Sequence, residues 1–242
     1  MGAKINLFLY LKSFIKTVLK ELCDLVYKRK CINCGCQIPV KILCKNCAKI
    51  VQYLPFYAQS TINGFNVYSA FYYEGAVKKL IQALKFKHNK VISLYLAEYL
   101  FEYINSVINN KQNGLNLKGA IIIPVLTHKK NYNKRGYDNV LLIAEELSNL
   151  SGYELKKSII KTKYTEPMYN LTRKERLRHI EGSFELNADF DINKPVILLD
   201  DIMTTGSTLN YLTGLFKEKG IKNLICLTVA KTRFNNSNKK RF

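Results

Sequence analysis

A chain of 242 residues is long enough to bury one sizeable α/β core together with a small additional module. Its hydrophobic fraction of 48% is ordinary for a globular protein, and no apolar run reaches the roughly 20 residues that a membrane-spanning helix needs. The net charge of +20 is unusual, and it indicates an anionic partner, either a polyphosphate or a nucleic acid, bound in a salt-sensitive way.

The first predicted element is an amphipathic helix over residues 5–27. Leu7, Leu11 and Phe14 begin an apolar series at helical spacing, and lysines recur four residues apart on another face. Such a basic helix either packs on its own protein, which we favour, or lies on a membrane surface.

A cluster of cysteines follows this helix, with five of the seven cysteines in one short segment. Cys31-x-x-Cys34 and Cys44-x-x-Cys47 have the spacing of a four-thiolate tetrahedral zinc site. Cys36 is a fifth thiol that could replace Cys34 as a ligand. The alternatives are reduced buried cysteines or a single redox C-x-x-C. Because no secretory signal is recognised, this clustering favours a reducing compartment, and we expect a cytoplasmic protein.

The pattern after residue 65 is typical of an α/β fold. Short apolar runs with strand character alternate with amphipathic helical segments, and we see no internal repeat. We expect strands at 66–73, 120–125, 196–199 and 223–230, and helices at 76–86, 91–108, 137–150 and after 206. The expected organisation is an N-terminal helix (1–30), a zinc knuckle (31–57), an α/β domain (65–232) and a basic tail (233–242).

The most informative stretch is residues 196–209. Four apolar residues predict a buried parallel strand, and Asp200 and Asp201 stand at its carboxyl end, where open α/β sheets bind ligands. A turn rich in hydroxyl and amide groups then opens a helix, which suits a phosphate monoester. Asp200 and Asp201 can accept hydrogen bonds from two neighbouring sugar hydroxyls beside this phosphate site. The combination predicts a ribose 5-phosphate ligand. The phosphate-binding residues would be Thr204, Thr205, Gly206, Ser207 and Thr208.

This stretch resembles the phosphoribosyl pyrophosphate (PRPP) motif of type I phosphoribosyltransferases. One alternative is a strand ending in a threonine-rich helix cap, which leaves the acid pair unexplained. Another is the Walker B strand of a P-loop ATPase, but no G-x-x-x-x-G-K-[ST] occurs in the chain. We expect Mg²⁺ to bind with PRPP, held in part by Asp200 and Asp201.

Further basic residues are candidates for binding the pyrophosphate group. A loop after the strand at 120–125 carries His128, Lys129, Lys130 and Arg135, although a basic turn on a basic surface is the alternative. Lys85 and Lys87 either face the same pocket or are ordinary charges at the end of a helix. A basic segment, 156–181, is a candidate lid over a polyphosphate, or else a solvated or nucleic-acid-contacting loop. The lid residues we single out are Arg173, Lys174 and Arg176.

The order of these pieces resembles the ComF family of competence proteins, a phosphoribosyltransferase-like domain behind a cysteine knuckle. The resemblance runs from about residue 19 to 232 and is carried by the two cysteine pairs, 83–86, 123–125, 134–137, 173–184 and the PRPP stretch. Two differences bear on acceptor recognition or turnover. The common Arg-Gly-Phe-Asn-Gln stands here as residues 135–139 with Tyr137, Asp138 and Asn139, and Met168 and His179 replace a glutamine and an asparagine.

The resemblance implies a type I phosphoribosyltransferase-like parallel sheet, a role in DNA uptake during natural transformation, and partners among competence helicases and recombination proteins. Three functions stay open: an active phosphoribosyltransferase, a non-catalytic adaptor that binds single-stranded DNA or a helicase, and a nucleotide-salvage enzyme. The charge and the 16 tyrosines agree with binding to single-stranded DNA, although most of these tyrosines are better explained by packing.

Overall fold

A computed structural model describes residues 29–39, 42–54, 60–87, 89–109, 116–163, 180–187 and 189–233. The chain divides into two compact units, Met1–Val51 and Gln52–Phe242. The helix predicted over residues 5–27 lies outside the described residues, as do all of the basic tail beyond residue 233 and the lid residues Arg173, Lys174 and Arg176.

The described part of the first unit is a small knuckle. Strands β1 (Arg29–Lys30) and β2 (Gln37–Ile38) pair antiparallel, and the reversal between them carries Cys31, Cys34 and Cys36. The short helix α2 (Lys45–Lys49) begins directly after Cys44, whose side chain accepts a hydrogen bond from the backbone amide of Cys47. The first C-x-x-C pair therefore lies in the turn between the two strands, and the second lies at the start of α2.

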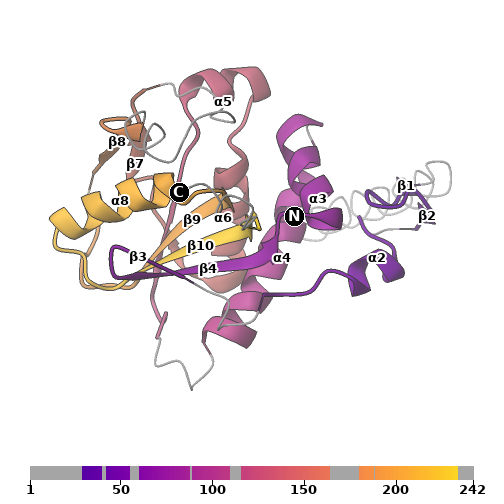
Figure 1. The fold of residues 1–242 in the computed structure, drawn as a ribbon, viewed down its shortest axis with the longest axis horizontal. Helices are drawn as coiled ribbons and strands as arrows, with labels where there is room; N and C mark the ends of the chain where they lie inside the picture. Colours follow the sequence, from indigo (N-terminus) through magenta and orange to yellow (C-terminus); the bar gives the residue numbers. More distant parts are fainter. Residues whose placement is uncertain are drawn as a thin grey trace, which may run out of the picture. The chain divides into compact units, whose positions relative to one another are not determined.

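The second unit is built on a six-stranded sheet of order β3-β4-β10-β9-β5-β6 (Figure 1). The edge strand β3 (Ser60–Ile62) is antiparallel to its neighbour, and the other pairs are parallel. The parallel strands are β4 (Phe65–Tyr72), β10 (Leu224–Lys231), β9 (Val196–Met203), β5 (Ile121–Pro124) and β6 (Glu154–Leu155).

Both faces of the central strands are buried. Val196 and Leu198 pack in one cluster with Leu212 and Phe216 of helix α8 (Ser207–Glu218). Because side chains alternate along a strand, Ile197 and Leu199 point to the opposite face, and they are also fully buried. Helix α6 (Asn139–Ser151) contacts β5 and β9, and helix α4 (Val91–Tyr103) packs on α6.

Two further helices begin after the carboxyl-terminal ends of parallel strands. Helix α3 (Gly75–Phe86) follows β4, and α5 (Lys129–Arg135) follows β5. Helix α4 continues as a π-helical turn, η2 (Ile104–Ile108). Of the described helices, Val91–Ile108 alone is long and apolar enough to cross a membrane, but such a stretch is also found in buried helices, and its packing on α6 accounts for that composition.

The main α/β elements therefore match the sequence-based expectations to within a few residues. The differences are short elements with little local signal. Residues 60–62, which the sequence assigned to no element, form β3, and the basic loop after β5 forms α5. Strands β7 (Ile159–Lys161) and β8 (Phe184–Leu186), neither of which was predicted, form an antiparallel pair. Strands of two or three residues depend on tertiary pairing, which no sequence period reveals.

Candidate functional site

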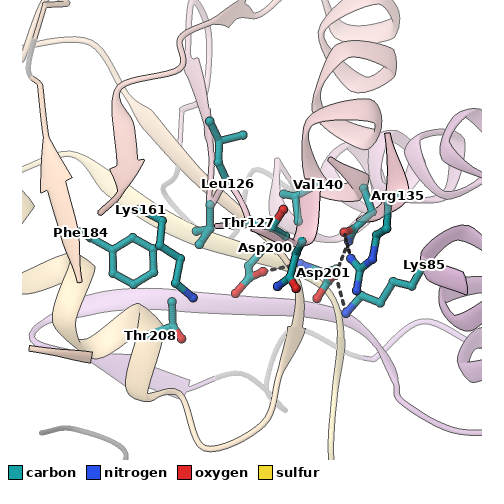
Figure 2. A pocket seen from close by; sticks show the side chains of 13 residues that line it. Lys85, Leu126, Thr127, Arg135, Val140, Lys161, Phe184, Asp200, Asp201 and Thr208 are labelled. Atoms are coloured by element: carbon teal, nitrogen blue, oxygen red, sulfur yellow. Dashed lines mark hydrogen bonds and ion pairs between the residues drawn. The ribbon is translucent and has the colours of Figure 1, made fainter. Parts of the chain in front are cut away.

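A cavity of about 200 Å³ opens at the carboxyl-terminal ends of β5 and β9 (Figure 2). This is the edge at which parallel α/β sheets hold their ligands. Seven elements or connections contribute: Lys85 from α3; Val125, Leu126 and Thr127 after β5; Asn131 and Arg135 from α5; Asn139 and Val140 from α6; Lys161 from β7; Phe184 from β8; and Asp200, Asp201 and Thr208 around the β9–α8 turn.

Asp200 lies in the middle of this group. In Figure 2, Lys161 and Thr208 are on one side of Asp200, and Lys85 and Arg135 are on the other. The Asp201 backbone amide donates to Asp200 Oδ1 at 2.8 Å. Burial, reinforced by the neighbouring Asp201 carboxylate, raises the pKa of Asp200 to about 7. A carboxylate in this environment is stabilised by a cation or hydroxyl donor that enters the cavity.

Asp201 is engaged by side chains of other elements. Lys85 Nζ lies 2.7 Å from Asp201 Oδ2, and the same oxygen accepts a hydrogen bond from Asn139 Nδ2. The side-chain oxygen of Asn139, Oδ1, in turn accepts a hydrogen bond from Arg135 Nη1 at 3.0 Å. Although burial opposes the charged form, the Asp201 carboxylate raises the pKa of Lys85, so this lysine stays protonated. We call Arg135, Asn139, Asp201 and Lys85 the Asp201 network.

The turn after β9 brings the predicted phosphate-binding residues to the start of α8. Gly206 has the left-handed φ of 74° as the residue before the helix, and a Cβ atom there would lie 3.1 Å from Ile62 Cδ1. The Thr205 and Ser207 hydroxyls are hydrogen-bonded at 2.9 Å. Of the five predicted residues, Thr208 lines the cavity, and Thr204 is exposed at the turn.

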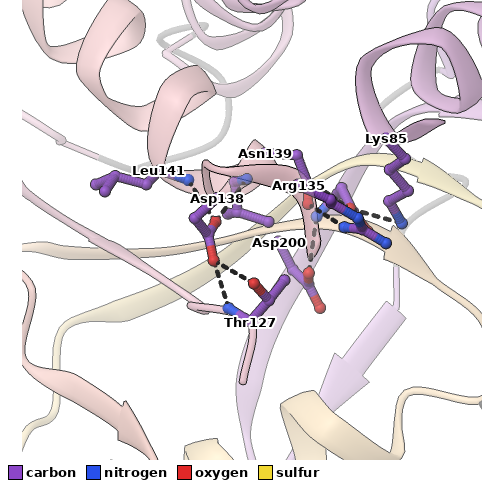
Figure 3. Close-up of polar contacts among 9 residues, drawn as sticks. Lys85, Thr127, Arg135, Asp138, Asn139, Leu141 and Asp200 are labelled. Atoms are coloured by element: carbon purple, nitrogen blue, oxygen red, sulfur yellow. Dashed lines mark hydrogen bonds and ion pairs between the residues drawn. The ribbon is translucent and has the colours of Figure 1, made fainter. Parts of the chain in front are cut away.

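The connection after β5 is organised by Asp138, the N-cap of α6 (Figure 3). Its carboxylate accepts hydrogen bonds from the backbone amides of Val140 and Leu141, both at 2.9 Å. It also accepts from the amide and the hydroxyl of Thr127, at 2.5 and 2.7 Å. Asp138, which stands where the common Arg-Gly-Phe-Asn-Gln stretch has asparagine, thus holds the β5–α5 connection against the start of α6.

The predicted pyrophosphate-binding residues are distributed unevenly around the cavity. Arg135 lines it, whereas His128, Lys129 and Lys130 are not among its lining residues. His128 instead caps α5, with Nδ1 accepting from the Lys130 amide at 3.1 Å. Lys85, for which the sequence left two interpretations, points into the cavity.

Lys161 and Phe184 are cavity residues that the sequence did not single out. They stand opposite each other in the β7–β8 pair, and Lys161 Nζ lies 5.2 Å from the centre of the Phe184 ring. Burial lowers the pKa of Lys161, while the Asp200 carboxylate opposes this shift. The sequence offered little to identify them: Lys161 lies in the basic segment 156–181, and Phe184 lies just after it. Their pairing depends on tertiary structure and leaves no local pattern in the sequence.

The cysteine knuckle is a second candidate site, located in the first unit. The Sγ atoms of Cys31, Cys34, Cys44 and Cys47 all lie within 4.8 Å of one another. The Cys34–Cys44 Sγ separation is 3.7 Å, close to the roughly 3.8 Å edge of a tetrahedron with Zn–S bonds of about 2.3 Å. Burial disfavours the Cys31 thiolate, but backbone amides including that of Cys44 lower its pKa to about 6. The four thiols therefore fit a zinc ion.

Comparison with known proteins identifies relatives, although no family model matches the chain. The chain is 29% identical over 203 residues to competence protein F of Haemophilus influenzae, covering 78% of this chain and 86% of that protein. Identity to competence protein ComFC of Streptococcus pneumoniae is 26%, covering 64% and 63%. Identity to DNA utilization protein YhgH of Salmonella typhimurium is 24%, covering 61% and 64%. The last two matches span less than two thirds of the relatives' length.

Solved structures of phosphoribosyltransferases show weak similarity. A hypoxanthine phosphoribosyltransferase from Trypanosoma cruzi has a TM-score of 0.33 and 14% identity, covering 64% of this chain and 73% of that chain. An adenine phosphoribosyltransferase from Thermoanaerobacter pseudethanolicus has a TM-score of 0.34 and 12% identity, covering 77% and 98%. Similarity at these TM-scores is too weak to support an assignment, so the fold class rests on sheet topology and the β9–α8 turn.

The fold is that of a type I phosphoribosyltransferase-like protein. It has a mainly parallel sheet with helices on both faces, and an acid pair followed by a threonine-rich turn at the ligand-binding edge. The sequence relatives narrow this class. Over most of its length the chain is similar to competence protein F and, over a shorter stretch, to competence protein ComFC, and in sequence its cysteine cluster precedes the α/β fold.

Proposed function

We propose that the cavity binds PRPP, or a related ribose 5-phosphate ligand, together with Mg²⁺. The backbone amides and hydroxyls of residues 204–208 are suited to the 5-phosphate, because a helix N-terminus offers unpaired N–H donors and a favourable dipole. The position of Asp200 between this turn and the Lys85–Arg135 end is the observation that carries the proposal. A carboxylate there can accept ribose hydroxyls.

The opposite end of the cavity is suited to the pyrophosphate group. Arg135 and Lys85 supply positive charge, and Thr127 follows the β5 strand at the same edge. We also propose that residues 128–130, at the start of α5, contribute to pyrophosphate binding. Arg173, Lys174 and Arg176 are proposed lid residues. Bound Mg²⁺ would neutralise pyrophosphate oxygens, and a carboxylate such as that of Asp200 fits the oxygen-rich coordination that Mg²⁺ prefers.

Isothermal titration calorimetry with PRPP and MgCl₂ tests this proposal. We expect binding by the unaltered chain and much weaker binding by Asp200→Asn, which removes the charge at nearly constant shape. Glu218→Gln, at the far end of α8, is the matched control because it removes an exposed carboxylate outside the cavity. No heat at millimolar PRPP would remove the proposal.

The proposed reaction is transfer of the ribose 5-phosphate group from PRPP to an acceptor nucleophile, with pyrophosphate leaving. The chain's own groups would hold the sugar, stabilise the leaving polyanion and exclude water. Release of pyrophosphate in the presence of candidate acceptors, including free purines and pyrimidines, separates this activity from ligand binding alone. Turnover with a free base would favour the salvage alternative.

We further propose that the protein acts in the cytoplasm in DNA uptake, as the names of its relatives suggest. The net charge of +20 supports contact with single-stranded DNA, helicases or recombination proteins. Filter binding of a single-stranded oligonucleotide over a salt series tests the DNA-binding part. Affinity that is weak even at low salt would contradict it, whereas strong binding without PRPP binding would favour a non-catalytic adaptor.

The knuckle is proposed to hold one structural Zn²⁺ through Cys31, Cys34, Cys44 and Cys47. The geometric fit of the four Sγ atoms supports this role. When bound, zinc would cross-link the two C-x-x-C turns and thereby stabilise a unit too small to bury a large core.

A further inference from the structure

The two acids at the end of β9 point to opposite faces of the sheet. Val196 and Leu198 pack in the cluster that contains α8, and strand alternation places Asp200 on that same side. Asp201 lies on the opposite face, where it accepts a hydrogen bond from Asn139 and forms an ion pair with Lys85. Adjacent positions in the sequence thus have different surroundings.

The Asp201 carboxylate is committed to protein donors. Lys85 and Asn139 both use Asp201 Oδ2, and the two charged side chains are largely buried, with 20% of Lys85 and 11% of Asp201 exposed. Turning this carboxylate toward a ligand would leave the lysine charge without its counter-ion, and an uncompensated buried charge is strongly destabilising.

The Asp200 carboxylate differs in this respect. Its Oδ1 atom receives the Asp201 backbone amide, and within the described residues it forms no ion pair. Electrostatic attraction to Asp200 opposes the lowering of the Lys161 pKa that burial causes. Among the described residues, Asp200 therefore has no ion pair like Lys85–Asp201 that a ligand would have to break.

Resting on the proposed function, we infer that the two acids have separate roles. Asp200 is the carboxylate that contacts the sugar or its magnesium, and Asp201 is a positioning residue that fixes Lys85 and Asn139 at the other end of the cavity. Through Asn139, this positioning extends to Arg135. The acid pair thus contributes one ligand-binding group and one internal anchor.

The first test compares PRPP affinity with MgCl₂ and with EDTA in Asp200→Asn and Asp201→Asn. The substitutions are matched, because each removes one charge at nearly constant shape from neighbouring positions. We expect Asp200→Asn to lose the magnesium-dependent gain in affinity. We expect Asp201→Asn to bind more weakly in both buffers while keeping that gain. Loss of the gain in Asp201→Asn would overturn the division of roles.

The second test needs no ligand and measures urea unfolding midpoints in a double-mutant cycle. Lys85→Met leaves Asp201 as a buried, unpaired charge, so adding Asp201→Asn should recover part of the lost midpoint. Lys85→Met combined with Asp200→Asn should recover less. Equal recovery by the two combinations would overturn the inference. If the unaltered chain binds no PRPP, the proposed function fails, while this cycle still decides whether Asp201 is the anchor.

Discussion

Lys85, in the last turn of α3, and Asp201, near the end of β9, form an ion pair with 2.7 Å between Lys85 Nζ and Asp201 Oδ2. The contact joins two segments that are far apart in the sequence and closes one end of the cavity. A basic residue that by sequence resembles an ordinary helix-terminal charge is therefore part of the candidate site. The energetic importance of this pair lies mainly in the cost of removing one partner alone.

Gly206→Ala should destabilise the protein and weaken PRPP binding. The left-handed φ of 74° strains any residue with a Cβ atom, and that atom would lie 3.1 Å from Ile62. We expect a loss of at least about 1 kcal/mol in the free energy of unfolding, measured with urea. Gly214→Ala is the control, because this glycine is inside α8 with no heavy atom within 4 Å of the added Cβ. It should be neutral or stabilising by about 0.5–1 kcal/mol, and a similar loss in both variants would contradict the argument.

Stability should depend on pH through Asp200. Its pKa of about 7 in the folded chain is above the roughly 3.9 of an unfolded aspartate, so the folded state binds more protons between these values. Stability contributed by the protonated acid is therefore lost as pH rises toward and through 7. In magnesium-free buffer, the Tm of Asp200→Asn relative to the unaltered chain should rise between pH 5 and pH 8. Glu218→Gln should show no such trend, and a pH-independent difference for Asp200→Asn would refute the assigned burial.

The knuckle should bind about one zinc per chain, measured by elemental analysis of untagged protein. Cys31→Ser and Cys44→Ser should lower both zinc content and solubility, because each removes a ligand from the four-thiol cluster. Cys36→Ser is the control within the same segment, since Cys36 is exposed and outside that cluster. Full zinc content in Cys34→Ser, with loss in Cys36→Ser, would exchange the roles of these two residues.

Asp138→Ala should destabilise the chain by about 1–2 kcal/mol, the usual cost of a lost helix N-cap. The substitution also removes the acceptor for Thr127, so the β5–α5 connection loses its attachment to α6. Urea unfolding measures the loss of stability, and PRPP titration measures the effect on the cavity. Asp138→Asn keeps one acceptor oxygen and should cost less. Equal losses of stability in the two variants would contradict the view that the Asp138 carboxylate stabilises the chain by bonding both Thr127 and the start of α6.

The sequence by itself determined the parts that depend on local order. Four apolar residues, two acids and a threonine-rich turn specify a buried strand, its polar end and the start of a helix, because burial and capping act on neighbouring residues. The two C-x-x-C pairs likewise have a spacing that predicts a four-thiol cluster, and the four Sγ atoms do lie together. The parallel α/β class followed from the alternation of strands and helices.

Tertiary structure decided which groups share the cavity and how each acid is surrounded. Lys161 and Phe184 reach the cavity through a pairing of two very short strands, and Lys85 reaches it from the end of α3. Asp200 and Asp201 are equivalent as letters in the sequence, but they point to opposite faces of β9. Their partners come from elements far along the chain, so the distinction between a ligand-facing acid and an anchored one arises only when those elements pack together.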